Sequence, residues 1–114
     1  MKIAVTALDS HIDAKISPVL ERCSHFLIFE NHVSDIFQVA GNPYYLQSNG
    51  ADIFCAQLLI RLGISLIITG SCSKNSINIC KAAGIKIICI ADETVKTALQ
   101  NFRRNSYTAL KESI

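Results

Sequence analysis

Hydrophobic and polar positions alternate along this 114-residue chain in blocks that predict a series of short strands and helices. Strands are predicted where β-branched and aromatic residues cluster, and helices where apolar residues recur every three or four positions. The predicted strands cover residues 2–7, 25–30, 33–40, 65–69 and 85–90. The predicted helices cover residues 51–62, 75–83 and 94–103, and the last ten residues carry so little pattern that we expect a frayed end.

The order of these elements predicts a mixed five-stranded sheet with helices packed on it. A short turn at Asn31-His32 joins the second and third strands, which indicates an antiparallel hairpin. Each of the two later strands follows a helix, so the right-handed crossover rule places both beside the first strand. Residues 64–69 are apolar almost throughout, as in parallel strands that are buried on both faces. The outline is a ribonuclease H-like three-layer α/β fold, with a single domain over residues 1–114.

Composition and charge argue against several classes of protein. The chain is 50% hydrophobic and 18% charged, which is typical of a globular domain and not of a disordered chain. Its formal net charge of +2 argues against strong electrostatic binding to nucleic acid. The apolar run at the N-terminus is too short for a signal peptide, and Arg61 interrupts the longest apolar stretch. We therefore expect a cytoplasmic protein that has no membrane partner.

Five cysteines without a CxxC pair predict neither a disulfide framework nor a structural zinc site. Three of them occupy apolar positions of predicted helices and strands and are expected to be buried: Cys55, Cys80 and Cys89. The histidines lie in or beside loops at spacings that do not suit a metal, so we expect exposed side chains at His11, His25 and His32.

The loop that follows the strand at residues 65–69 is the first candidate site. It opens at Gly70 with small polar residues, and helical periodicity resumes after it. Ligands of open α/β sheets bind just beyond the carboxyl end of a strand, where the next helix offers N–H donors and a partial positive charge. Cys72 in this loop is expected to be partly thiolate for the same reason. A loop cysteine without a function is an equally good interpretation of the local sequence.

Cys23 is the second cysteine in polar surroundings, because it follows Glu21-Arg22 and precedes Ser24-His25. The adjacent arginine would favour its thiolate form. On its local sequence alone, a structural role for Cys23 is the better interpretation.

Two other classes of function stay open. A phosphate-ester hydrolase on this fold would use clustered carboxylates around a divalent ion, and Asp9, Asp13 and Asp52 are the candidates. They come from separate loops, and the first strand carries no carboxylate, which argues against that chemistry. The sequence contains no GxSxG, GxGxxG or GxxxxGK[ST] motif. A module that binds a small phosphate or carboxylate metabolite would instead use Ser71, Ser73, Lys74 and Asn75 at the helix N-terminus.

Several short motifs in register resemble one family over nearly the whole chain. The opening strand at residues 1–5 is similar to that of the dinitrogenase iron–molybdenum cofactor family, the small relatives of nitrogenase-cofactor carriers. Residues 12–17 resemble its "LDSxVS" turn, and residues 20–28 resemble its "FGRCxYFLI" stretch. Residues 49–59 resemble its glycine-led helix with "AQLL". Residues 68–76 resemble its "ITGHCGPKAF" loop, and residues 81–85 its "KAAGI".

This resemblance implies a ribonuclease H-like fold and a function as a non-catalytic carrier of an iron–sulfur or iron–molybdenum type cluster. It also implies partner proteins that assemble or accept the cluster. Nothing in the sequence decides the oligomeric state. We expect one partly exposed site where the ends of the first and fourth strands meet, with Cys72 and Cys23 as metal ligands. The residues implied for this site are Gly70, Ser71, Cys72, Ser73, Lys74, Asn75, Arg22 and Cys23.

Overall fold

The computed structural model describes residues 1–31 and 33–104. Its strands are β1 (Ile3–Ala7), β2 (His25–Phe29), β3 (Phe37–Gly41), β4 (Leu66–Thr69) and β5 (Lys86–Cys89). Its helices are α1 (Ala51–Arg61), α2 (Lys74–Ala82) and α3 (Val95–Arg104), and a short 3-10 turn, η1 (Leu20–Arg22), precedes β2. All eight predicted strands and helices are present. His32 and the last ten residues, for which a turn and a frayed end were predicted, lie outside the described residues.

The five strands form one mixed sheet in the order β3-β2-β1-β4-β5. β1 is antiparallel to β2 and parallel to β4, while β3 is antiparallel to β2 and β5 is parallel to β4. The predicted hairpin and the predicted pairing of the first and fourth strands are both confirmed. β4 is buried along its whole length because β1 and β5 flank it and helices cover the sheet. The ribonuclease H-like label itself stays a prediction.

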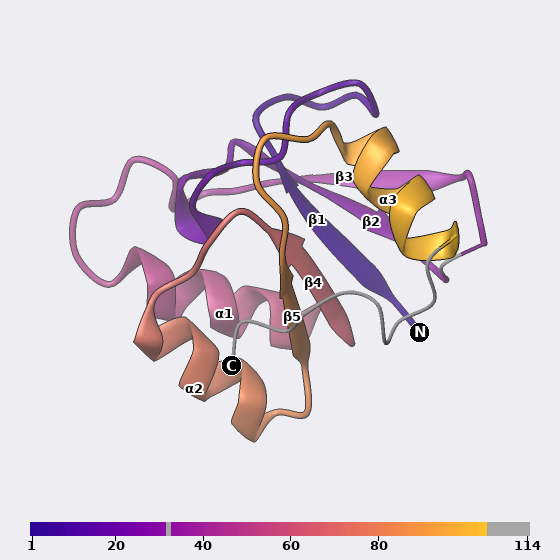
Figure 1. Ribbon diagram of the computed structural model, residues 1–114. Helices are drawn as coiled ribbons and strands as arrows, with labels where there is room; N and C mark the ends of the chain where they lie inside the picture. Colours follow the sequence, from indigo (N-terminus) through magenta and orange to yellow (C-terminus); the bar gives the residue numbers. More distant parts are fainter. Residues whose placement is uncertain (32, 105–114) are drawn as a thin grey trace.

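Helices cover both faces of the sheet, which makes three layers (Figure 1). α1 and α2 pack on one face over a core that includes Phe26, Leu59 and Ile67. α3 packs on the other face over a second core with Phe29 and Ile68. Successive strand residues alternate between these cores, since side chains of a strand point to opposite faces of a sheet. In the part of the chain that the structure describes, no helix is long and apolar enough to cross a bilayer.

The third strand differs most from its prediction, because it begins at Phe37 and not at residue 33. Residues 33–36 form an irregular segment in which Ser34 Oγ accepts a hydrogen bond from the Ile36 N–H at 3.1 Å. A serine that bonds its own backbone in this way competes with strand pairing. The other strands and helices begin and end within one or two residues of their predicted bounds.

Candidate functional site

A cleft of about 290 Å³ opens at the edge of the sheet where the three parallel strands β1, β4 and β5 end. Its walls come from the segment that follows β1, from the loop after β4 and from the segment that follows β5. We call it the rim cleft. Its lining is mostly apolar, with one lysine and one aspartate: Leu8, Lys15, Ile16, Pro18, Gly70, Ile90, Ala91 and Asp92. The cleft therefore occupies the position where open α/β sheets usually bind ligands.

Main-chain hydrogen bonds fasten the loop after β4 to the segment before η1. The Gly70 N–H donates to the Ser17 carbonyl at 3.0 Å, and the Leu20 N–H donates to the Ser71 carbonyl at 2.9 Å. Ser71 Oγ donates to the Pro18 carbonyl at 2.7 Å. A Cβ atom added at Gly70 would lie 2.6 Å from the Pro18 oxygen, so only glycine allows this close approach. This side of the rim cleft is thus held in place mainly by main-chain hydrogen bonds and by the close approach of Gly70 to Pro18.

The other wall is fastened in the same way to the segment that follows β5. The Ile16 N–H donates to the Glu93 carbonyl at 2.9 Å, and the Val95 N–H donates to the Ala14 carbonyl at 2.9 Å. Asp92, at the mouth of the cleft, has a positive φ of 57°. Aspartate tolerates this left-handed conformation better than most residues do. Segments far apart in the sequence therefore hold the cleft open from both sides.

Cys72 lies two residues beyond Gly70 and is half-buried, which confirms its predicted partial exposure. Its side chain packs against the core under α1 and α2 and is not part of the cleft lining. Ser73 is the N-cap of α2, since its Oγ accepts a hydrogen bond from the Ser76 N–H at 3.1 Å. The loop that carries the cysteine therefore ends in a well-capped helix.

Asp52, in the first turn of α1, lies across the N-terminus of α2. Its Oδ2 accepts hydrogen bonds from Ser73 Oγ at 2.7 Å and from Asn75 Nδ2 at 3.4 Å. The hydrogen bond from Ser73 is the main cause that lowers the pKa of the Asp52 carboxyl below its ordinary value of 3.8. The Asp52 carboxylate thus already binds two of the side chains, Ser73 and Asn75, that an external anion would use at this helix end.

The prediction that Cys23 is partly exposed is wrong, because its side chain is fully buried beneath Asn42. Asn42 Nδ2 donates to the Cys23 carbonyl at 2.9 Å and lies 3.7 Å from Cys23 Sγ. On its other side, Asn42 Oδ1 accepts a hydrogen bond from Cys55 Sγ at 3.3 Å. Burial, with a smaller contribution from Cys55, raises the pKa of the Cys23 thiol to about 12. Cys23 is therefore a protonated core thiol.

The remaining predicted site residues lie in two places. The structure brings Gly70, Ser71, Cys72 and Ser73 together in one loop, and α2 begins with the exposed Lys74 and Asn75. Arg22, by contrast, lies at the end of η1. Its Nη1 donates to the Tyr45 carbonyl at 3.0 Å and to the Gln47 carbonyl at 2.8 Å. In this structure Arg22 therefore braces the loop before α1.

The thiols are unequal as donors to a metal or cluster. Cys55 and Cys80 are buried in the core as predicted, and burial raises the pKa of each thiol to about 11. Cys89 is only partly buried, in contrast to its prediction, because β5 is an edge strand. Among residues 1–31 and 33–104, no three histidine, cysteine or acidic side chains are grouped so that they could hold a metal ion. The described site can thus offer the sulfur of Cys72 as one ligand, but not four protein ligands around one cluster.

Apart from Gly70, the sequence prediction missed the residues that line the rim cleft: Leu8, Lys15, Ile16, Pro18, Ile90, Ala91 and Asp92. Ile90, Ala91 and Asp92 line the rim cleft, although no motif marks them. Their position directly after a buried parallel strand is the signal that could have identified them. Two of the carboxylates that were candidates for a hydrolase accept hydrogen bonds from neighbouring residues: Asp9 from the Ser10 N–H and Asp52 from Ser73 Oγ.

Taken together, the fold and the cleft define a small α/β protein with a ligand-sized opening at the carboxyl ends of its parallel strands. Residues 1–105 match the family described as dinitrogenase iron-molybdenum cofactor, and the chain belongs to this family. No match was found among curated protein sequences.

Two solved structures are similar to this chain over most of its length. The apo form of the orange protein from Desulfovibrio gigas is 26% identical, with a TM-score of 0.86 over 98% of this chain and 92% of that protein. A putative NifB protein from Thermotoga is 22% identical, with a TM-score of 0.80 over 97% of this chain and 91% of that protein. The second similarity supports the fold alone.

Proposed function

We propose that this protein is a non-catalytic carrier of an anionic metal–sulfur cluster of the iron–sulfur or iron–molybdenum type. The single observation that carries the proposal is the rim cleft, which opens at the carboxyl ends of the parallel strands in a chain that belongs to this family. The orange protein, a relative solved in its apo form, points the same way. The partners would be the proteins that assemble the cluster and those that accept it.

The lining of the rim cleft suits a compact anion with a polarisable surface. The apolar walls formed by Leu8, Ile16 and Ile90 would displace water from the surface of a bound cluster, and this would strengthen charge interactions at the cleft. Lys15 supplies a positive charge that can face the cluster. The Asp92 carboxylate, which also lines the cleft, repels an anion. Its repulsion would offset part of the attraction that Lys15 and the apolar walls provide.

Cys72 is the thiolate that we assign to the cluster, because it lies on the same short loop as Gly70. The cluster would lie over the rim cleft and beside the Gly70–Ser73 loop, where Cys72, which does not line the cleft itself, would supply one ligand. Cys23 is left out of this assignment because its thiol is buried and has a raised pKa. A cluster held by one cysteine and an open cleft is bound more weakly than a cluster held by four cysteines. Weak binding suits a carrier, because a carrier must release its cluster.

No observation favours the two other functions that the sequence left open. For a metabolite-binding module, Ser71 Oγ donates to the Pro18 carbonyl, and Ser73 Oγ and Asn75 Nδ2 donate to Asp52. These side chains are therefore engaged with the protein.

Anaerobic reconstitution with iron and sulfide tests the proposal. Wild-type protein should develop visible absorption that remains after gel filtration, and Cys72→Ala should lose most of it. Cys89→Ala is the matched control, because Cys89 is also a half-buried cysteine but lies in the edge strand β5, outside the loop. Wild-type protein that never takes up colour, or a Cys72→Ala variant as coloured as Cys89→Ala, would show that the proposed site is wrong.

A further inference from the structure

Among the described residues, the outer edge of β3 lacks the charged residues and prolines that often protect an edge strand. β3 pairs with β2 on one side and is the last strand in the sheet. Its sequence from Phe37 to Gly41 contains neither a charged residue nor a proline. Edge strands of monomeric proteins commonly carry such residues because an open edge pairs readily with another strand. The opposite edge, β5, does carry one, the exposed Lys86 at its first position.

The register of the hairpin shows which main-chain groups face this edge. The Asn42 N–H donates to the Ser24 carbonyl at 2.9 Å, in continuation of the β2–β3 ladder. Because hydrogen-bonded pairs alternate along an antiparallel ladder, the residues at 38 and 40 bond to β2. The N–H and C=O groups of Phe37, Val39 and Gly41 therefore point to the free edge, as a template for a further strand.

Exposed apolar side chains accompany these groups. Val39 is 44% exposed in the middle of the strand, and Ile36 is 81% exposed just before it. Val33, in the irregular segment before Ile36, is also 68% exposed. Apolar side chains beside an open ladder are the usual composition of an interface and not of a solvated edge.

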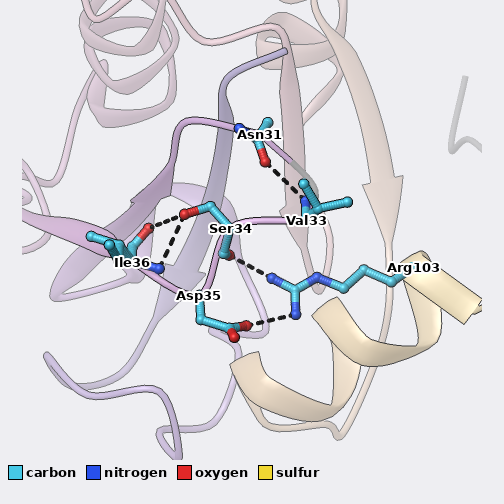
Figure 2. A network of polar contacts seen from close by, with 6 residues as sticks. All are labelled: Asn31, Val33, Ser34, Asp35, Ile36 and Arg103. Carbon is cyan, nitrogen blue, oxygen red and sulfur yellow. Dashed lines mark hydrogen bonds and ion pairs between the residues drawn. The ribbon is translucent and has the colours of Figure 1, made fainter.

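The start of β3 is held in place by α3 (Figure 2). Arg103 Nη1 donates to Asp35 Oδ1 at 2.9 Å, and its Nη2 donates to the Ser34 carbonyl at 2.5 Å. Ser34 Oγ in turn accepts from the Ile36 N–H. An edge that is already ordered loses less entropy when a partner strand binds.

We propose that a second copy of this chain pairs with β3, antiparallel, around a two-fold axis at Val39. The two sheets would then continue into one sheet across the interface, with Phe37 of one copy opposite the partner's Gly41. An antiparallel pair of identical edges closes on itself as a dimer. Pairing of β3 with the other edge would build an open fibre instead, and Lys86 opposes it.

Charge does not oppose the two-fold arrangement. Asp35 lies just before β3, and its carboxylate is 88% exposed. In the register centred on Val39, Asp35 of each copy lies opposite the partner's Pro43, so the two Asp35 carboxylates stay at opposite ends of the interface and do not repel each other. The rim cleft lies at the ends of β1, β4 and β5, so the dimer leaves both clefts open.

Sedimentation velocity of the full chain at increasing concentration tests the dimer. Because two short strands make a small interface, we expect a dissociation constant of roughly 10–100 μM. Val39→Lys places two like charges opposite each other on the axis and should raise the dissociation constant at least about tenfold. Ile60→Lys, on the exposed surface of α1, is the matched control and should dimerise like the wild type. A chain that stays monomeric, or a Val39→Lys variant that dimerises like the control, would overturn the proposal.

Amide hydrogen exchange provides a second readout that depends on the geometry. At high protein concentration the amides of Phe37, Val39 and Gly41 should become protected, and on dilution they should exchange faster. The amides of Gln38 and Ala40 bond to β2 and should be protected at both concentrations. Exchange at Phe37, Val39 and Gly41 that does not change with concentration would contradict pairing at this edge.

Discussion

Single residues show how far local sequence can predict a side chain's environment. Cys55 and Cys80 were predicted to be buried because they recur with leucine and isoleucine on one face of a helix, and both are buried. Cys23 has polar neighbours in the chain, which indicated partial exposure. Its burial depends on Asn42, which lies 19 residues further along the chain and caps it in space. No local pattern contains that contact.

Asn42 should therefore contribute strongly to stability. Its buried side chain bonds to the carbonyls of Glu21 and Cys23, to the Tyr44 N–H and to the Cys55 thiol. Because Asn42→Ala leaves these buried groups without partners, we expect it to lower the free energy of unfolding by about 2–4 kcal/mol.

Urea denaturation followed by circular dichroism measures this loss. Asn78→Ala is the control, because Asn78 is exposed on α2 and its removal should change stability by less than about 0.5 kcal/mol. Equal stability of the two variants would show that the Asn42 network is not a major stabilising feature.

Helices and strands were predictable where periodicity alone determines them, and less so where other elements intervene. The bounds of α1 and α2 follow from apolar spacing and from the glycines after them, and they agree to within one residue. The start of β3 was predicted four residues too early. Residues 33–36 have strand-like composition, but bonds within Ser34–Ile36 and from Arg103 hold them in another conformation.

The link between α1 and α2 gives a pH-dependent prediction. Asp52 accepts hydrogen bonds from Ser73 and Asn75, and the pKa of its carboxyl is lowered as a result. A group whose pKa is lower in the folded state stabilises the protein above its ordinary pKa, and this stabilisation disappears as the pH falls through the folded value. Asp52→Asn should thus cost about 0.5–1 kcal/mol near neutral pH, since the carboxylate is partly exposed to solvent.

The difference in unfolding free energy between wild type and Asp52→Asn should be constant near neutral pH and should shrink below pH 3.8. Urea denaturation at a series of pH values checks this. Asp13→Asn serves as the control, because Asp13 is exposed and lies outside the network. A difference that is independent of pH would contradict the assigned role of the Asp52 charge.

At the scale of the whole molecule, the strand order was predictable because few topologies obey the crossover rule. The sequence also predicted a site at the edge where the ends of β1 and β4 meet, and the rim cleft opens at that edge. It did not predict most of the residues that line the cleft, because the cleft arises where residues 8–19 fold over and bond to both the Gly70 loop and the Glu93 segment. Contacts between loops so distant in sequence leave no periodic signal.

The central claim is that the rim cleft holds a metal–sulfur cluster, and filling the cleft tests it most directly. Ala91→Trp places a large side chain in the cleft lining at an exposed position, where the fold can tolerate it. Ala82→Trp, at the exposed end of α2, adds the same side chain away from the cleft. Iron and sulfide bound per chain should be measured after anaerobic reconstitution, with circular dichroism to verify folding. The account predicts that Ala91→Trp loses most of the bound cluster while Ala82→Trp retains the wild-type amount. Equal loading of the two variants would contradict it.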